Sequence, residues 1–176
     1  MTARLYIVES VKGYKSKTFS GHKDYVLAAY FSKDQKSIYT VGRDGAVYTW
    51  TAKSSSDSDE DSEADVDMNN EQPLPSTSSL DHPVNQVGNT RWGVESKHFC
   101  NQPHSKVTSV TFHSASSLLI VGFSNGVFGL WEMPSFNSIH TLSISQEKIT
   151  SVAVNASGEW LAFGASKLGQ LLVWEW

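Results

Sequence analysis

Three segments of the chain share one pattern of apolar and polar positions. Each segment holds three short runs rich in Val, Ile, Phe, Tyr and Thr, and each run is bounded by Ser, Asp, Asn or Gly, a pattern typical of β-strands. The runs lie at 26–31, 38–41 and 44–50, at 107–112, 118–121 and 125–131, and at 149–154, 160–163 and 168–174. The chain is therefore predicted to be built from repeated β-meanders.

The spacing inside the segments is nearly constant. The branched residue that opens a segment precedes its turn glycine by 19 residues in two copies and by 20 in the third. That glycine precedes a tryptophan by 5 residues in every copy, at Trp50, Trp131 and Trp174. Four-stranded units recurring every 40 to 45 residues are typical of propeller blades.

We therefore expect an all-β fold, a β-propeller fragment of about three four-stranded blades. Outer strands are predicted at 17–20, 94–100 and 137–143, and residues 3–8 indicate the third strand of a preceding blade. Three partial blades cannot close a ring of about four to eight, so we interpret the chain as part of a longer propeller. We expect the chain to consist of three parts. Residues 1–52 hold the end of one blade and the first repeat, residues 53–90 form a linker, and residues 91–176 form two further blades, the last incomplete.

The linker has a different composition from its flanks. It holds seven acids between positions 57 and 67 and three of the five prolines. Such a stretch buries too little surface to offset about 1–2 kcal/mol per residue of ordering entropy, so we expect it to be disordered. Four serines with an acid three residues later suit acidophilic kinases and are candidate phosphorylation sites: Ser54, Ser56, Ser58 and Ser62. Alternatively, the linker shields a basic groove from RNA in cis.

Charge and composition narrow the class of protein. Residues 51–90 hold nine acids and one base, a net charge of −8 in a chain of −4, so the remainder carries +4. No run approaches the roughly 18 apolar residues of a membrane helix, and the first 20 residues lack the apolar core of a signal peptide. With a single cysteine, Cys100, the sequence indicates a soluble intracellular protein in a reducing compartment.

The sequence offers no catalytic chemistry. Its six histidines have no metal-ligand spacing, and it contains no phosphate loop, nucleophile elbow or paired-carboxylate signature. We therefore expect that the protein is not an enzyme and that it binds no cofactor and no metal. The candidates for contact with a partner or RNA are Arg43, Arg91, Trp92, Lys97 and Lys167. For the lysines the alternative is a solvated charge, and for Trp92 it is packing on a blade edge.

The first repeat resembles the WD40-repeat family. Four of its residues match that family's structural tetrad: His22, Thr40, Asp44 and Trp50. The resemblance implies a buried set of hydrogen bonds that leaves no polar group unpaired. The second copy departs from it, with Val121 and Asn125 in place of the hydroxyl and the acid, and the third copy has neither the His nor the Asp. We expect those two blades to rely on apolar packing alone.

Residues 91–176 are also similar to a nucleolar branch of that family, the periodic tryptophan proteins, most specifically over 158–176. The resemblance implies a non-catalytic scaffold of ribosome biogenesis. Its implied partners are other WD-repeat subunits of a small-subunit processome subcomplex, with small nucleolar RNP and pre-rRNA contacted directly or through proteins during early processing toward 18S rRNA. Two alternatives remain open: an interaction module of another complex, and a domain that binds RNA directly.

Overall fold

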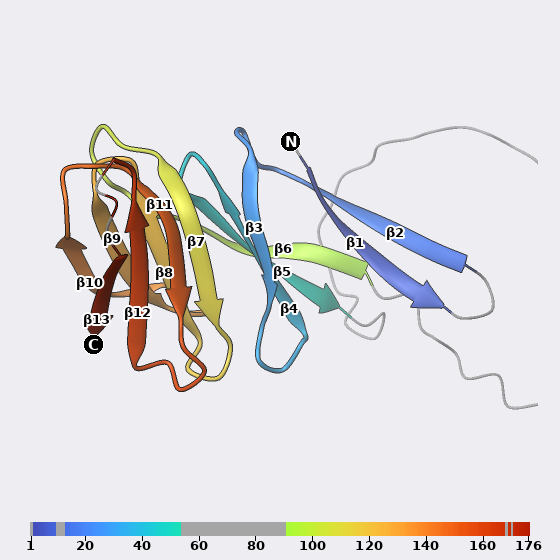
Figure 1. Ribbon diagram of the computed structural model, residues 1–176. Coiled ribbons are helices and arrows are strands. Elements are labelled where there is room, and N and C mark those ends of the chain that lie inside the picture. Colours follow the sequence, from blue (N-terminus) through green and yellow to red (C-terminus); the bar gives the residue numbers. More distant parts are fainter. Residues whose placement is uncertain (1, 10–12, 54–90, 168, 170) are drawn as a thin grey trace, which may run out of the picture.

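The computed structural model describes residues 2–9, 13–53, 91–167, 169 and 171–176. All secondary-structure elements within these ranges are β-strands, so the all-β prediction is confirmed (Figure 1). The strands are β1 (Thr2–Glu9), β2 (Gly13–Ser20), β3 (Val26–Phe31), β4 (Ser37–Gly42), β5 (Ala46–Lys53), β6 (Arg91–Phe99), β7 (Val107–His113), β8 (Leu118–Phe123), β9 (Val127–Glu132), β10 (Asn137–Ser143), β11 (Ile149–Val154), β12 (Trp160–Ala165) and β13 (Leu171–Glu175).

The strands form antiparallel sheets in which chain neighbours pair with each other. Blade 1 is the four-stranded sheet β3–β4–β5–β6, blade 2 is β7–β8–β9–β10 and blade 3 is the three-stranded sheet β11–β12–β13. A separate pair, β1–β2, precedes blade 1. Figure 1 shows β11, β7 and β3, the first strands of the three blades, following one another across the molecule.

Blade 1 is completed from the far side of the linker. β6 pairs with β5 along its length, with Phe99 opposite Ala46 and Arg91 opposite Lys53. β6 therefore belongs to the sheet of blade 1 although it follows the linker in sequence, and the backbone groups on the outer edge of β5 bond to it rather than remaining unpaired. In the same way β2, the earliest predicted outer strand, pairs with β1 and not with blade 1.

Each first strand carries an irregularity at its second residue. The pairing register shifts between the first and third residues of β3, β7 and β11. A β-bulge of this kind leaves one residue out of the ladder and bends the strand. The residues concerned are Leu27, Thr108 and Thr150.

The hydrophobic core lies between the blades. Tyr39, Val41 and Val47 of blade 1 pack in one buried cluster with Leu119 and other residues of blade 2. A second cluster joins blade 2 to blade 3, and a third joins blade 1 to the leading pair. Full burial of one such side chain contributes about 1.5–3 kcal/mol, so the joints between neighbouring sheets, and not the sheets alone, stabilise the arc.

Candidate interaction surface at the loop end of the blades

Six turns lie together at one end of the strands, the upper end in Figure 1. They follow β2, β4, β6, β8, β10 and β12, and we call the surface they form the loop face. Backbone hydrogen bonds connect successive turns. The Arg43 N–H donates to Tyr25 O at 2.8 Å, and the Val107 N–H donates to Arg43 O at 3.1 Å. The second of these bonds ties blade 2 to blade 1, so the loop face is continuous across the two blades.

The predicted tetrad lies under the loop face of blade 1. His22 Nε2 is 2.7 Å from Thr40 Oγ1, and the indole Nε1 of Trp50 donates to the same oxygen at 2.9 Å. Because that oxygen accepts from the indole, the hydroxyl hydrogen of Thr40 is available to His22 Nε2. All three side chains are buried. The hydroxyl thus joins the turn after β2 to two strands of blade 1.

Asp44 completes the tetrad next to a glycine that has no room for a side chain. A Cβ on Gly42 would lie 2.6 Å from Asp44 Oδ1 and 2.7 Å from His22 Nδ1, so both groups converge on this position. Asp44 Oδ1 also accepts from the Ala46 N–H at 3.2 Å. Burial lowers the pKa of His22, and the charge of Asp44 opposes that shift. The structure therefore brings all four predicted tetrad residues together around the His22 ring.

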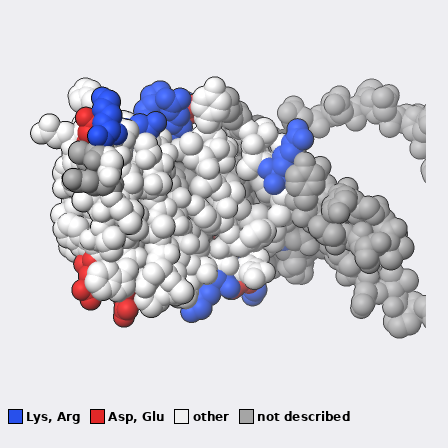
Figure 2. Space-filling model, in the orientation of Figure 1, with Lys and Arg blue, Asp and Glu red and all other residues white. Residues whose placement is uncertain are grey.

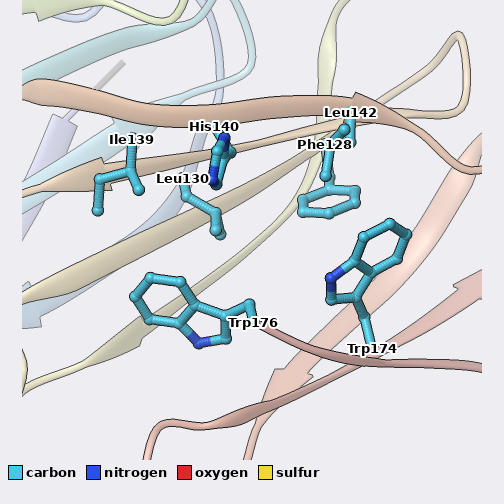
Figure 3. A pocket seen from close by; sticks show the side chains of 7 residues that line it. All are labelled: Phe128, Leu130, Ile139, His140, Leu142, Trp174 and Trp176. Carbon is cyan, nitrogen blue, oxygen red and sulfur yellow. The ribbon is translucent and has the colours of Figure 1, made fainter.

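The other two repeat tryptophans have different surroundings. Trp131 is buried and stacks on Phe136 with ring centroids 5.7 Å apart, and Phe136 in turn stacks on His98 of blade 1 at 4.7 Å. Trp174 is 40% exposed and lines an apolar cavity of about 320 Å³ (Figure 3). Aromatic stacking across the joint thus takes the place of the tetrad in blade 2.

The expectation that blades 2 and 3 rely on apolar packing alone is wrong at the joint between them. Thr108 Oγ1 donates to Ile149 O at 2.5 Å, across the two blades, and lies 3.1 Å from Gly122 O within its own. Thr108 is the bulge residue of β7, so its side chain departs from the regular alternation of the strand. Strand periodicity treats this position as an ordinary one, and therefore gave no signal.

The loop face presents five exposed cations: Lys23, Arg43, Lys106, Lys148 and Lys167. Three acids lie among them, and each has a partner. Asp24 Oδ1 accepts from the Tyr25 N–H, and its Oδ2 is 3.9 Å from Lys106 Nζ. Glu147 Oε2 is 3.7 Å from Lys167 Nζ, and Asp44 bonds to Ala46. Figure 2 shows basic side chains along this upper edge, with others at the right and along the lower edge, and acidic side chains at the upper left and lower left.

Comparison with known proteins defines the family. The model of the WD domain, G-beta repeat, matches residues 13–51, 95–132 and 136–175. The chain belongs to the WD40-repeat family. Each matched WD40 repeat includes a strand that pairs with the preceding sheet, namely β2, β6 or β10, so that a repeat of the sequence and a blade of the structure are offset by one strand.

Longer proteins carry a similar WD40 sequence. The chain is 47% identical to the periodic tryptophan protein 2 homolog of Neurospora crassa, 44% to periodic tryptophan protein 2 of Saccharomyces cerevisiae and 40% to the homolog of Schizosaccharomyces pombe. Each alignment covers 100% of this chain but only 17%, 18% and 19% of the relative. The chain spans about a fifth of the length of these relatives.

A solved structure shares the WD40 fold at low sequence identity. The β-propeller domain of Cps50 (Swd1) from Myceliophteria thermophila superposes with a TM-score of 0.62 at 13% identity, over 98% of this chain and 45% of that one. At this identity the likeness shows the fold alone. The prediction of a WD40 propeller fragment is confirmed by the repeats, the sheets and this neighbour together.

The remaining candidate residues do not join the loop-face cations into one site. Trp92 packs edge-on against Phe19 with centroids 5.9 Å apart, beside the buried tryptophan of the WD40 tetrad. Lys97 Nζ lies 5.0 Å from the ring centroids of both Tyr48 and Phe99. Arg91 opens β6, and its side chain is outside what the structure describes. These three residues lie within β6 and not in the turns of the loop face.

Several sequence-based expectations fall on other parts of the chain. The four candidate phosphorylation sites, Ser54, Ser56, Ser58 and Ser62, lie outside the described residues.

Within the described ranges, no three His, Cys, Asp or Glu side chains cluster in a way that could hold a metal ion. No described helix is long and apolar enough to cross a bilayer. Burial raises the pKa of the Cys100 thiol to about 12.

Proposed function

We propose that this chain is part of a non-catalytic scaffold of ribosome biogenesis that works in the nucleolus. In this role it supports assembly of the small-subunit processome and early processing of pre-rRNA toward 18S rRNA. The observation that carries the proposal is the similarity to periodic tryptophan proteins over 100% of the chain, at 40–47% identity in three fungi. The similarity includes blade 1, which contains the linker, and the third repeat. A generic WD40 repeat would not be similar over so long a stretch.

The geometry of the tetrad supports a scaffold role. A His and an Asp in one buried neighbourhood could act as a general base with its orienting acid. Here the ring nitrogen of His22 faces the Thr40 hydroxyl, which is fully buried and also bonded to Trp50. The ring nitrogen that a general base would use for proton transfer is thus engaged in a hydrogen bond that holds the turn before β3 in place. The proposed partners are accordingly macromolecules: other WD-repeat subunits, and small nucleolar RNP and pre-rRNA.

A second candidate function is direct RNA binding by the loop face. Five exposed cations lie on that surface, and such a surface can follow a phosphate backbone. Affinity that depends on phosphate contacts falls steeply with salt because counterions are released on binding. The scaffold reading ranks first because the same surface also contains three acids.

The test is purification of the tagged full-length protein from cells, followed by mass spectrometry and RNA sequencing, with and without RNase. We expect processome subunits together with a box C/D small nucleolar RNA, and retention of the WD-repeat subunits after RNase. Recovery of membrane-coat or ubiquitin-ligase components instead would overturn the proposal. Loss of every protein partner after RNase would favour the RNA-binding alternative.

A further inference from the structure

We infer that the loop face at the joint of blades 1 and 2 binds an acidic segment of a partner protein, with Tyr25 and Arg43 at its centre. This deepens the proposed scaffold function and rests on it for the existence of a protein partner. We call the surface formed by Lys23, Tyr25, Arg43 and Lys106 the Tyr25 surface.

The four residues come from three turns that the backbone holds side by side. Lys23 and Tyr25 lie in the turn before β3, Arg43 in the turn after β4, and Lys106 in the turn before β7. The N–H of Arg43 donates to the carbonyl of Tyr25, and its carbonyl accepts from the N–H that follows Lys106. The surface therefore exists before any partner arrives, which reduces the entropy cost of binding.

Tetrad residues lie next to two of the cations, Lys23 and Arg43, and fix their backbone. Lys23 follows His22 directly, and Arg43 precedes Asp44 directly. Since His22 is bound to the buried Thr40 hydroxyl and Asp44 to the Ala46 N–H, both cations project from anchored positions. The tetrad is complete only in blade 1, which is also the blade that supplies Tyr25 and Arg43.

The charges of the Tyr25 surface are arranged so that cations face outward. Asp24 is held by the Tyr25 N–H and by Lys106, and only 25% of its side chain is exposed. No ion pair within the described ranges engages Lys23 or Arg43, although both are exposed. A guanidinium of this kind can bind a carboxylate through two parallel hydrogen bonds.

The residue types favour a protein over a nucleic acid. The Tyr25 side chain is 54% exposed beside Arg43, and Tyr and Arg are enriched among the residues that dominate protein interfaces. A phosphate backbone needs several uncompensated cations for useful affinity. Here two carboxylates lie among the three cations, and they would repel the evenly spaced phosphates of a nucleic acid. A peptide can carry acidic residues only where they meet Lys23, Arg43 or Lys106.

The first experiment uses the native complex purified with the full-length protein. A carbodiimide joins lysine amines directly to carboxylates, so mass spectrometry of the product identifies acidic residues in contact with a given lysine. We expect cross-links from Lys23 or Lys106 to Asp or Glu of a partner subunit. Cross-links confined to lysines of the opposite end, such as Lys36, would overturn the inference, as would ultraviolet cross-linking of Tyr25 to RNA.

The second experiment measures binding of a synthetic peptide that spans the cross-linked acidic segment to the purified full-length protein. We expect Arg43→Ala and Tyr25→Ala each to raise Kd about tenfold. The matched control is Lys36→Ala, an exposed lysine at the opposite end, which should change Kd less than twofold. Equal Kd values for all three variants would contradict the inference.

Two further measurements separate the outcomes. Thermal unfolding of each variant shows whether a lost contact reflects a lost fold, and Arg43→Lys keeps the charge if Arg43→Ala fails to fold. The identity of the cross-linked subunit tests the proposed function independently. If Lys23 is cross-linked to an acidic segment of a protein outside the processome, the proposed function is wrong and the inference holds. If processome subunits are recovered without that contact, the proposed function holds and the inference is wrong.

Discussion

The indole nitrogen of Trp50 donates a hydrogen bond to the hydroxyl of Thr40, 2.9 Å away, inside blade 1. The same oxygen lies 2.7 Å from the ring of His22, so three elements meet at one fully buried atom. A strand position that packing alone would give to valine here holds a hydroxyl. Val121, the matching residue of blade 2, shows that alternative: it is apolar and completely buried.

Replacing Thr40 by valine should destabilise the protein out of proportion to the change in volume. The variant leaves the indole N–H of Trp50 and a nitrogen of His22 buried without their oxygen, and one unsatisfied buried group costs about 1–3 kcal/mol. We expect the free energy of unfolding in urea to fall by about 2–3 kcal/mol. Thr40→Ser is the control because it keeps the hydroxyl. A larger loss for serine than for valine would contradict this role.

The burial of His22 makes stability depend on pH in one direction. The pKa of His22 is lowered from 6.5, mainly by burial, so the folded protein binds fewer protons at this ring than the unfolded chain does. Stability from this group is therefore present above pH 6.5 and is lost as pH falls through the folded-state pKa. Urea unfolding from pH 8 to pH 5 should show a steeper loss for the wild type than for His22→Gln. Identical slopes would contradict the assignment.

A methyl group on Gly42 should disturb the tetrad. The added Cβ would lie within 2.7 Å of both Asp44 Oδ1 and His22 Nδ1, so the strand or the two side chains must shift. Overpacking of this kind costs about 1–3 kcal/mol. Gly93→Ala is the matched control, because no atom of the described residues lies within 4 Å of its added Cβ. The prediction fails if the two alanine variants unfold at the same urea concentration.

The hydroxyl of Thr108 should stabilise the joint between blades 2 and 3. Thr108→Val removes the bond to Ile149 O as well as the one to Gly122 O, and a net loss of about 1 kcal/mol is expected. Thr150→Val removes only a bond within blade 3, to Gly164 O, and serves as the control. Hydrogen exchange at the Ile149 amide should quicken more in the first variant than in the second.

Repeat spacing predicted most of the strands because each blade obeys local rules. The interval from the opening residue to the turn glycine, and from there to the tryptophan, is set by strand length and by a tight turn with positive φ, such as that of Gly45 at 84°. These are properties of short stretches of chain. The tetrad was found for a related reason: its four residue types have fixed places within one repeat.

The rest depended on which sheets lie next to each other. The pairing of β6 with β5 crosses the linker, so no periodic signal connects the two strands. The stack of His98, Phe136 and Trp131 joins two blades. Arg43 was singled out in the sequence, but Tyr25 and Lys106 were not, because only the assembled turns bring them beside it.

The pairing of β5 with β6 also bears on how the protein tolerates change. The closure entropy of a connection grows only logarithmically with its length, so doubling the number of residues between these strands would cost about 0.6 kcal/mol. The turn at Asp44 and Gly45 is more constrained, because a one-residue slip of the pairing that it sets would move every side chain beyond it to the other face of the sheet. A change in length between Lys53 and Arg91 should therefore destabilise the protein less than the same change in the turn at Asp44 and Gly45.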